Sequence, residues 1–266
     1  SSAALADQIG NGSALFDGDD DFVELGSQSG DLRLSGSNGT VSAWILLPDV
    51  SDGDDYKRIV DKSDAGSGEN GYTMWVHTDG IAEFQINAVA GSKVTSSTAI
   101  TDGVWTHMAA TWDGTTVKLY QNGILVDSAT DSAQPPSDTT GMRIGSWNHS
   151  TAREFKGNIA QVGIWSTALT QAQINSIKEK TYDDLITSEK TNLVSWWGLD
   201  EVFLGSNRLN VSTTANFYDN GAIVEDKAGS FTEVLIDNID TLDNWEVGSN
   251  ATMSINADGN LLATGS

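Results

Sequence analysis

Short apolar stretches, separated by turns that contain glycine, dominate the chain from Thr40 to Trp165. The dipeptides Asp113-Gly114 and Asn122-Gly123 each lie between two such stretches. Dipeptides of this kind readily adopt the positive φ angles of tight hairpins, so the stretches are expected to form antiparallel strands. Many short strands at this spacing indicate an all-β fold, an antiparallel two-sheet sandwich of the jelly-roll type. We expect strands at residues 40–47, 71–76, 81–86, 105–112, 117–121, 124–128, 142–146 and 158–165.

One short helix is expected after these strands. Thr170 is followed three residues later by Gln173, which is the spacing of a capping box at a helix N-terminus. Ile174 and Ile177 then fall on one face of the helix, with Leu185 further along as a continuation. This face predicts a helix that covers one edge or end of the sandwich.

The pattern changes after about residue 200. We predict one jelly-roll domain over residues 1–200 and an extended connection over residues 201–230, where periodicity is weak. A new β pattern over residues 231–266 predicts part of a second β module, because about 36 residues are too few for an independent sandwich. These last strands are expected either to belong to a longer domain or to complete a sheet with a neighbouring subunit.

The charge of the chain excludes several classes of partner. The 37 acidic residues exceed the 14 lysines and arginines, which gives a formal net charge of −23. Repulsion from phosphates argues against nucleic acid as a partner and against anionic membrane surfaces. No apolar run approaches the roughly 18 residues of a membrane span, so no membrane insertion is expected. The absence of cysteine removes disulfides, thiol nucleophiles and cysteine-based metal sites.

Most tryptophans are expected in the core. Trp44, Trp112 and Trp165 occupy strand positions with apolar neighbours two residues away. The adjacent pair Trp196-Trp197 must point to opposite faces of a strand, which leaves room for one of the two to be exposed.

Several segments, in the same order along the chain, resemble laminin-G-like domains of the concanavalin A-like lectin and glucanase superfamily, to which the pentraxins are related. The resemblance covers residues 1 to about 200. It implies two sheets of six or seven strands each, with ligands on the concave sheet or in the rim loops, often with calcium. The segments are FDGDDDFVEL at 16–25, TVSAWI at 40–45, IVDK at 59–62, GYTMW at 71–75, DGVWTHMAATWDGTTVKLYQNG at 102–123, FKGNIAQVGIWSTAL at 155–169 and LVSWWGLDE at 193–201.

The resemblance to pentraxins points to two loops as a ligand site. In those relatives, acids and amides in the corresponding loops hold calcium ions that bind the ligand. Here the first loop contains Glu69 and Asn70, and the second runs from Trp147 to Glu154. A calcium-free sugar site is the alternative, in which Trp147 stacks on a sugar ring and its neighbours bind hydroxyl groups. The predicted ligand-binding residues are Glu69, Asn70, Trp147, Asn148, His149 and Arg153.

An acidic turn near the start of the chain is the predicted calcium site. Asp17, Asp19 and Asp21 alternate as in the start of an EF-hand loop, but the glycine and the glutamate that such a loop needs later are missing. Four acids in five residues repel one another unless a positive charge offsets them. Calcium could do so through these carboxylates and the carbonyl of Gly18, joined by Asp200 from the last strand of the sandwich. A solvated acidic turn is the alternative, and Asp52, Asp54 and Asp55 are expected to form a second, solvated acidic loop.

The chain lacks the three-acid strand motif of the laminarinase-like glucanases in this superfamily, and it also lacks two general motifs of hydrolases. No E-x-D-x-E strand motif, G-x-S-x-G elbow or H-E-x-x-H motif occurs. The leading hypothesis is therefore a non-catalytic glycan-binding or adhesion module of an extracellular or virion-surface protein. The first alternative is a structural component of a phage or other particle, such as a capsid decoration or tail appendage. The second alternative is a polysaccharide-active enzyme built from scattered carboxylates.

Overall fold

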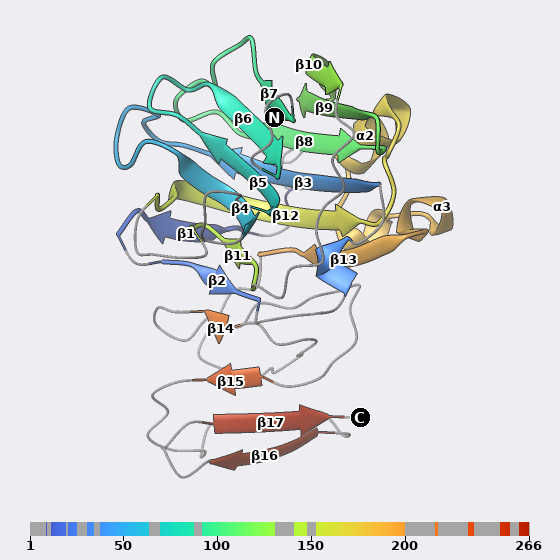
Figure 1. Ribbon diagram of the computed structural model, residues 1–266. Helices are drawn as coiled ribbons and strands as arrows, with labels where there is room; N and C mark the ends of the chain where they lie inside the picture. The colour runs from blue at the N-terminus through green and yellow to red at the C-terminus, as the bar shows by residue number, and fades with distance from the viewer. Residues whose placement is uncertain are drawn as a thin grey trace.

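The computed structural model (Figure 1) describes residue 9 and residues 12–19, 21–25, 31–34, 38–63, 70–87, 92–130, 141–147 and 153–199, together with the short strands that follow them. Two antiparallel sheets form the body of the molecule, and in Figure 1 one lies in front of the other. The predicted all-β sandwich is therefore confirmed. The number of strands in each sheet also agrees with the six or seven that the family resemblance implies.

The first sheet contains both the first strand of the sandwich, β1 (Ala14–Asp17), and its last long strand, β13 (Leu193–Trp197). Its order is β1, β12 (Lys156–Trp165), β3 (Gly39–Leu46), β8 (Thr106–Trp112), β9 (Thr116–Gln121) and β10 (Ile124–Thr130). β13 pairs with the second half of β12, while β1 pairs with the first half. The β9–β10 turn has positive φ at Asn122 and Gly123, as the dipeptide predicts.

The second sheet also contains seven strands. Its order is β14 (Asn216–Phe217), β2 (Val23–Glu24), β11 (Arg143–Ile144), β4 (Lys57–Ser63), β5 (Gly71–Val76), β6 (Ala82–Ile86) and β7 (Lys93–Thr95). β14 lies within the predicted connection of residues 201–230 and extends this sheet at β2. A separate three-stranded sheet has the order β15 (Val234–Ile236), β17 (Leu261–Gly265) and β16 (Ala251–Ile255), all within the predicted second module.

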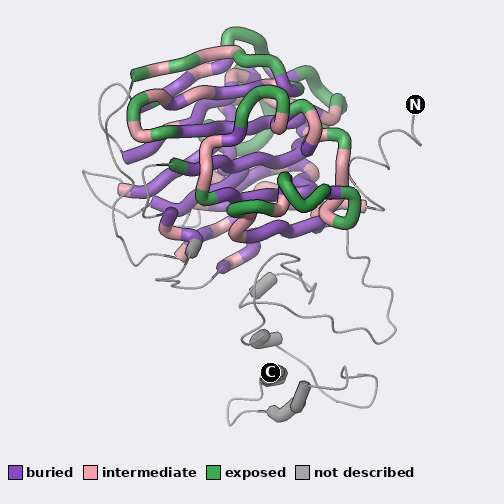
Figure 2. Tube along the Cα trace, turned by 90° about the vertical axis from the view of Figure 1, so that its right-hand side faces the viewer, coloured by how far each residue is buried: buried purple, intermediate pink, exposed green. Residues whose placement is uncertain are grey.

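The core lies between the two large sheets, and a second apolar cluster lies on the outer face of the first. Figure 2 shows the buried residues concentrated in the strands and the exposed ones in the loops. The second cluster contains Trp165, Trp196, Ile174, Ile177 and Leu185. It is covered by α2 (Gln171–Ile177), whose N-cap is Thr170 with the predicted capping box. The short helices η2 (Tyr182–Asp184) and α3 (Thr187–Lys190) follow it.

This second cluster explains the burial of both tryptophans of β13. Trp197 belongs to the core between the sheets, and Trp196 belongs to the cluster under α2. Their side chains are 1% and 2% exposed, so they do point to opposite faces but neither faces solvent. Trp44, Trp112 and Trp165 are also buried, as predicted. Among the described residues, no helix has both the length and the apolar character that a membrane crossing requires.

Candidate functional site

The outer face of the second sheet is polar, although much of it is buried. A β-bulge at Ile59 directs both Ile59 and Val60 into the core and leaves Arg58 and Asp61 together on the outer face. Because side chains alternate along a strand, the residues in register with these two face the same way. One row contains Arg58, Trp75, Glu83 and Thr95, and the next contains Glu24, Arg143, Asp61, Thr73, Gln85 and Lys93.

An ion pair lies at the centre of this face. Arg58 Nε is 3.3 Å from Asp61 Oδ2, and the two side chains are 3% and 0% exposed. The Asp61 carboxylate also accepts hydrogen bonds from Thr73 Oγ1 and Ser63 Oγ, each at 2.8 Å. The guanidinium of Arg58 lies 4.7 Å from the centre of the Trp75 ring, a cation–π distance. These contacts make the centre of the face rigid.

His77, just beyond the end of β5, has a carboxylate at each ring nitrogen. Nδ1 lies 3.0 Å from Asp55 Oδ1, and Nε2 lies 3.1 Å from Glu83 Oε2. Trp75 Nε1 donates to the same Nε2 at 3.0 Å, so in the neutral imidazole the proton resides on Nδ1 and is donated to Asp55. The imidazole is thus fixed in orientation from both sides.

Glu83 is held ionised by its partners. Burial by itself would raise the pKa of Glu83, but the hydrogen bonds from Lys93 and Thr95, together with the adjacent His77 ring, outweigh it and keep the pKa below its ordinary value. Lys93 Nζ lies 2.9 Å and Thr95 Oγ1 lies 3.0 Å from Glu83 Oε1. The pKa of Asp55 is likewise lowered, because the backbone N–H of Thr78 and the His77 ring outweigh a burial effect that would raise it.

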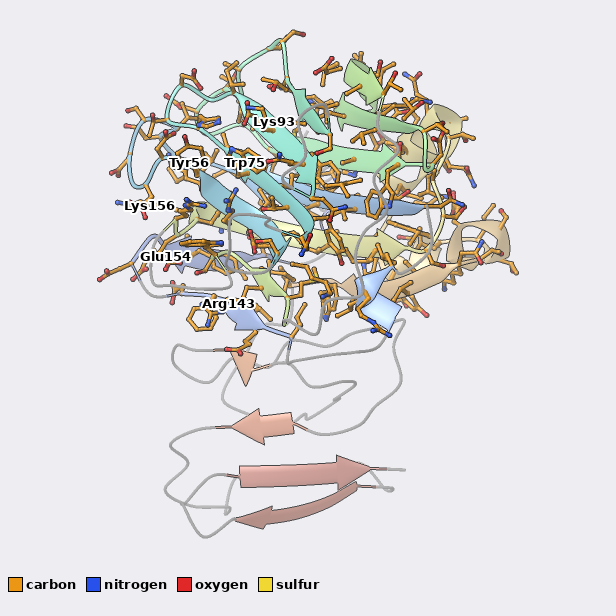
Figure 3. All side chains as sticks on the ribbon, in the orientation of Figure 1. Tyr56, Trp75, Lys93, Arg143, Glu154 and Lys156 are labelled. Atoms are coloured by element: carbon orange, nitrogen blue, oxygen red, sulfur yellow. The ribbon has the colours of Figure 1, made fainter. Side chains whose placement is uncertain are left out.

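Tyr56 is the exposed aromatic side chain at this end of the sheet. It precedes β4, has a left-handed backbone with φ of 65°, and is 41% exposed. Its ring centre lies 4.7 Å from that of His77 and 6.4 Å from that of Trp75. Figure 3 shows Tyr56 beside Trp75, with Lys156 and Glu154 along the same side of the molecule. An exposed ring of this kind, backed by fixed polar groups, can pack against the apolar face of a sugar.

Arg153 and Trp147 complete this end of the sheet. The guanidinium of Arg153 lies 4.1 Å from the Trp147 ring centre and 5.4 Å from that of Tyr56. Asp54 Oδ2 accepts a hydrogen bond from the backbone N–H of Arg153 at 2.7 Å. The acidic loop expected to be solvated is exposed, but Asp54 and Asp55 also connect the segments that surround Tyr56. We name the group formed by Tyr56, Trp75, His77, Trp147 and Arg153 the aromatic end of the sheet.

The predicted ligand residues are only partly within the described residues. Trp147 and Arg153 are brought together, whereas Glu69, Asn148 and His149 lie outside the described residues. Asn70 precedes β5, where Gly71 pairs with Ser63 at the far end of β4. That is the opposite end of the β4–β5 pair from Tyr56 and Arg153. A joint site of the two loops stays a prediction.

The predicted calcium turn has a different arrangement of charge. The carboxylates of Asp17 and Asp21 accept backbone hydrogen bonds within the turn, from Asp19 N and Asp17 N respectively, each at 2.8 Å. Lys156 lies against both Gly18 and the loop of Asp52, and its Nζ is 2.8 Å from Asp52 Oδ2. Lys156 therefore offsets part of the repulsion. Within the described ranges, which leave out Asp20 and Asp200, no three His, Asp or Glu side chains are grouped closely enough to hold a metal ion.

Comparison with known proteins identifies the family. The model of the concanavalin A-like lectin/glucanases superfamily matches residues 17–175, and the chain belongs to this superfamily. Among curated proteins, the chain is 28% identical over 172 residues to mouse pappalysin-1, a match that covers 56% of this chain and 10% of that protein. It is 26% identical over 114 residues to a rat protein with sushi, von Willebrand factor type A, EGF and pentraxin domains. That match covers 39% of this chain and 3% of the rat protein. The chain thus spans a small part of these relatives.

Solved structures show the same fold. A Bacteroides ovatus protein to which carbohydrate binding is attributed aligns with a TM-score of 0.58 and 18% identity, covering 82% of this chain and 55% of that one. The carbohydrate-binding module CBM40 of a Ruminococcus gnavus sialidase, bound to α2,3-sialyllactose, aligns with a TM-score of 0.51 and 12% identity. That alignment covers 63% of this chain and 96% of the module.

Proposed function

We propose that this domain is a non-catalytic glycan-binding module and that the aromatic end of the second sheet is its sugar site. The observation that carries the proposal is Tyr56, an exposed ring held beside His77 and Arg153 on a rigid polar face. Sugar sites need an aromatic surface for the ring and fixed polar groups for the hydroxyls. The binding of carbohydrate by the Ruminococcus module, and its attribution to the Bacteroides protein, support the same class of ligand.

Replacing Tyr56 with alanine is expected to weaken sugar binding about 5- to 30-fold, which corresponds to roughly 1–2 kcal/mol for a stacked aromatic ring. Alanine is no more strained than tyrosine in a left-handed backbone, so the fold should be kept. A glycan array with the whole chain identifies a ligand, and titration calorimetry then gives Kd for both proteins. The matched control is Ile124→Ala, another exposed side chain, on β10 of the other sheet, which should leave Kd within about twofold.

Two results would contradict this proposal in different ways. If Tyr56→Ala bound the sugar as tightly as the unmodified chain, the site would lie elsewhere on the domain. If the array gave no binding at all, with or without calcium, glycan recognition itself would be refuted. Hydrolysis of a bound polysaccharide, abolished by one Asp or Glu substitution, would favour the enzyme alternative instead.

The module is proposed to belong to an extracellular protein rather than to a phage or other particle. The alternative of a phage or particle component was motivated by C-terminal strands that could complete a neighbour's sheet. In the structure β15, β16 and β17 pair with one another, so their pairing requires no second chain. This pairing removes the observation that motivated the particle-component alternative.

Calcium at the Asp17–Asp21 turn stays a proposal that a melting experiment can test. If calcium binds the folded chain, removal with a chelator from a solution at ten times Kd should cost about 1.4 kcal/mol, or roughly 3–6 °C in Tm. Asp19→Asn should abolish that difference. An unchanged Tm on chelation would leave Lys156 as the charge that balances the turn.

A further inference from the structure

Arg153 differs from most of the other basic side chains on and around the outer face of the second sheet. Lys57, beside Tyr56, also has no ion pair among the described residues, but it is buried and its Nζ donates to the Val50 carbonyl at 2.9 Å. Each of four other basic side chains there lies within 3.6 Å of a carboxylate, whereas the described residues provide none for the guanidinium of Arg153. The four pairs are Arg58 with Asp61, Arg143 with Glu24, Lys93 with Glu83 and Lys156 with Asp52. The contrast is informative because the chain has 37 acids for only 14 basic residues, so acids outnumber bases more than twofold.

The backbone of Arg153 is fixed on both sides. Its N–H donates to Asp54 Oδ2 at 2.7 Å, and its carbonyl accepts from Arg58 N at 3.1 Å. Its φ of 65° is in the left-handed region, which a non-glycine residue adopts only where surrounding contacts enforce it. The side chain therefore starts from a defined point and a defined direction.

The guanidinium of Arg153 is held by aromatic rings. It lies 4.1 Å from the Trp147 ring centre and 5.4 Å from the Tyr56 ring centre. A guanidinium stacked on an aromatic face keeps its N–H donors at its edge, where they form a planar fork. Such a fork matches the two oxygens of a carboxylate in a bidentate arrangement.

We propose that Arg153 binds the carboxylate of an acidic sugar, such as a uronic or sialic acid, while Tyr56 packs against the same sugar or its neighbour. This inference rests on the proposed function and names its class of ligand. The net charge of −23 repels an anionic ligand at long range, so recognition requires a local cation that is not neutralised by the protein's own acids. Arg153 has that property within the described residues.

The test compares each acidic oligosaccharide with its own methyl ester, which removes the charge and keeps the shape. Calorimetry with glucuronate-containing and sialylated oligosaccharides distinguishes the two sources of the carboxylate. The unmodified chain is expected to bind at least one acid about tenfold more tightly than its ester. Arg153→Gln should lose the preference for the acid and keep the Kd for the ester within about twofold. Arg153→Lys should retain only part of the preference, because lysine keeps the positive charge but lacks the planar fork of the guanidinium.

A matched control removes the same charge elsewhere. Lys118 lies on β9 of the other sheet, and Lys118→Gln should leave the preference for the acid unchanged. Far-ultraviolet circular dichroism and urea unfolding confirm that each variant folds. Equal binding of acid and ester, or an Arg153→Gln variant that still prefers the acid, would overturn the inference and leave the glycan-binding function standing. No binding of any sugar by the unmodified chain would overturn both.

Discussion

Replacing Asp61 with alanine is expected to lower the free energy of unfolding by about 3–5 kcal/mol. Asp61 is fully buried on the outer face of β4, beside Arg58. Its carboxylate accepts hydrogen bonds from Thr73 and Ser63 in addition to the ion pair. Alanine takes this carboxylate away from three donors at once, in a place where water does not replace it. When one partner of a buried ion pair is removed, the other charge stays buried without compensation, and this lowers the stability strongly. Replacing both partners with apolar residues of similar size costs much less.

Urea unfolding followed by tryptophan fluorescence measures this loss. Asp61→Asn keeps an acceptor of the same shape without the charge, so it should fall between the unmodified chain and the alanine variant. Asp183→Ala is the matched control, because Asp183 is exposed in η2 and the same change there should stay within about 0.5 kcal/mol. A loss below about 1 kcal/mol for Asp61→Ala would show that the outer face does not depend on this ion pair.

Most of the sandwich could be predicted because short stretches of sequence determine its strands and turns. The Asn122-Gly123 turn and the alternation around it define a hairpin by themselves, and the Thr170–Gln173 capping box defines the start of α2. Agreement of several segments with one family then predicted two sheets of six or seven strands each. The exposure of Trp196 could not be decided locally, because it depends on α2, which begins 25 residues before it in the chain and packs over the first sheet.

The candidate site depends on contacts that a single sequence does not display. β4 contains Lys57, Arg58, Asp61 and Lys62 in seven residues, so its composition indicates a solvated segment rather than a buried strand. The bulge at Ile59 moves Arg58 and Asp61 to one face. The residue types around Ile59 do not predict a bulge. Tyr56 was missed because its importance comes from its neighbours, His77 and Arg153. The available signal was alternation in β5 and β6, which places Trp75 and Glu83 away from the core.

Acidification is expected to destabilise the fold through His107. This imidazole is 2% exposed on β8, next to Trp44, and burial lowers its pKa from 6.5 to about 3, with a smaller contribution from Lys178. Between these two pKa values the unfolded chain takes up a proton that the folded chain does not. Stability is therefore complete above pH 6.5 and is lost as the pH falls, by up to about 1.4 kcal/mol per pH unit.

At pH 4.5 the expected loss from His107 is about 2.7 kcal/mol relative to pH 7.5, and it should disappear in His107→Phe. Phenylalanine keeps an aromatic ring beside Trp44 and cannot be protonated, so the difference between the two proteins isolates this group from the carboxylates that also titrate. Urea unfolding at pH 7.5, 6.5, 5.5 and 4.5 gives the two curves. If the larger ring disturbs the packing around Trp44, His107→Gln provides the same comparison with a smaller neutral side chain. Parallel curves for the unmodified chain and both variants would contradict the prediction, because they would show that the buried imidazole takes up a proton as readily as it does in the unfolded chain.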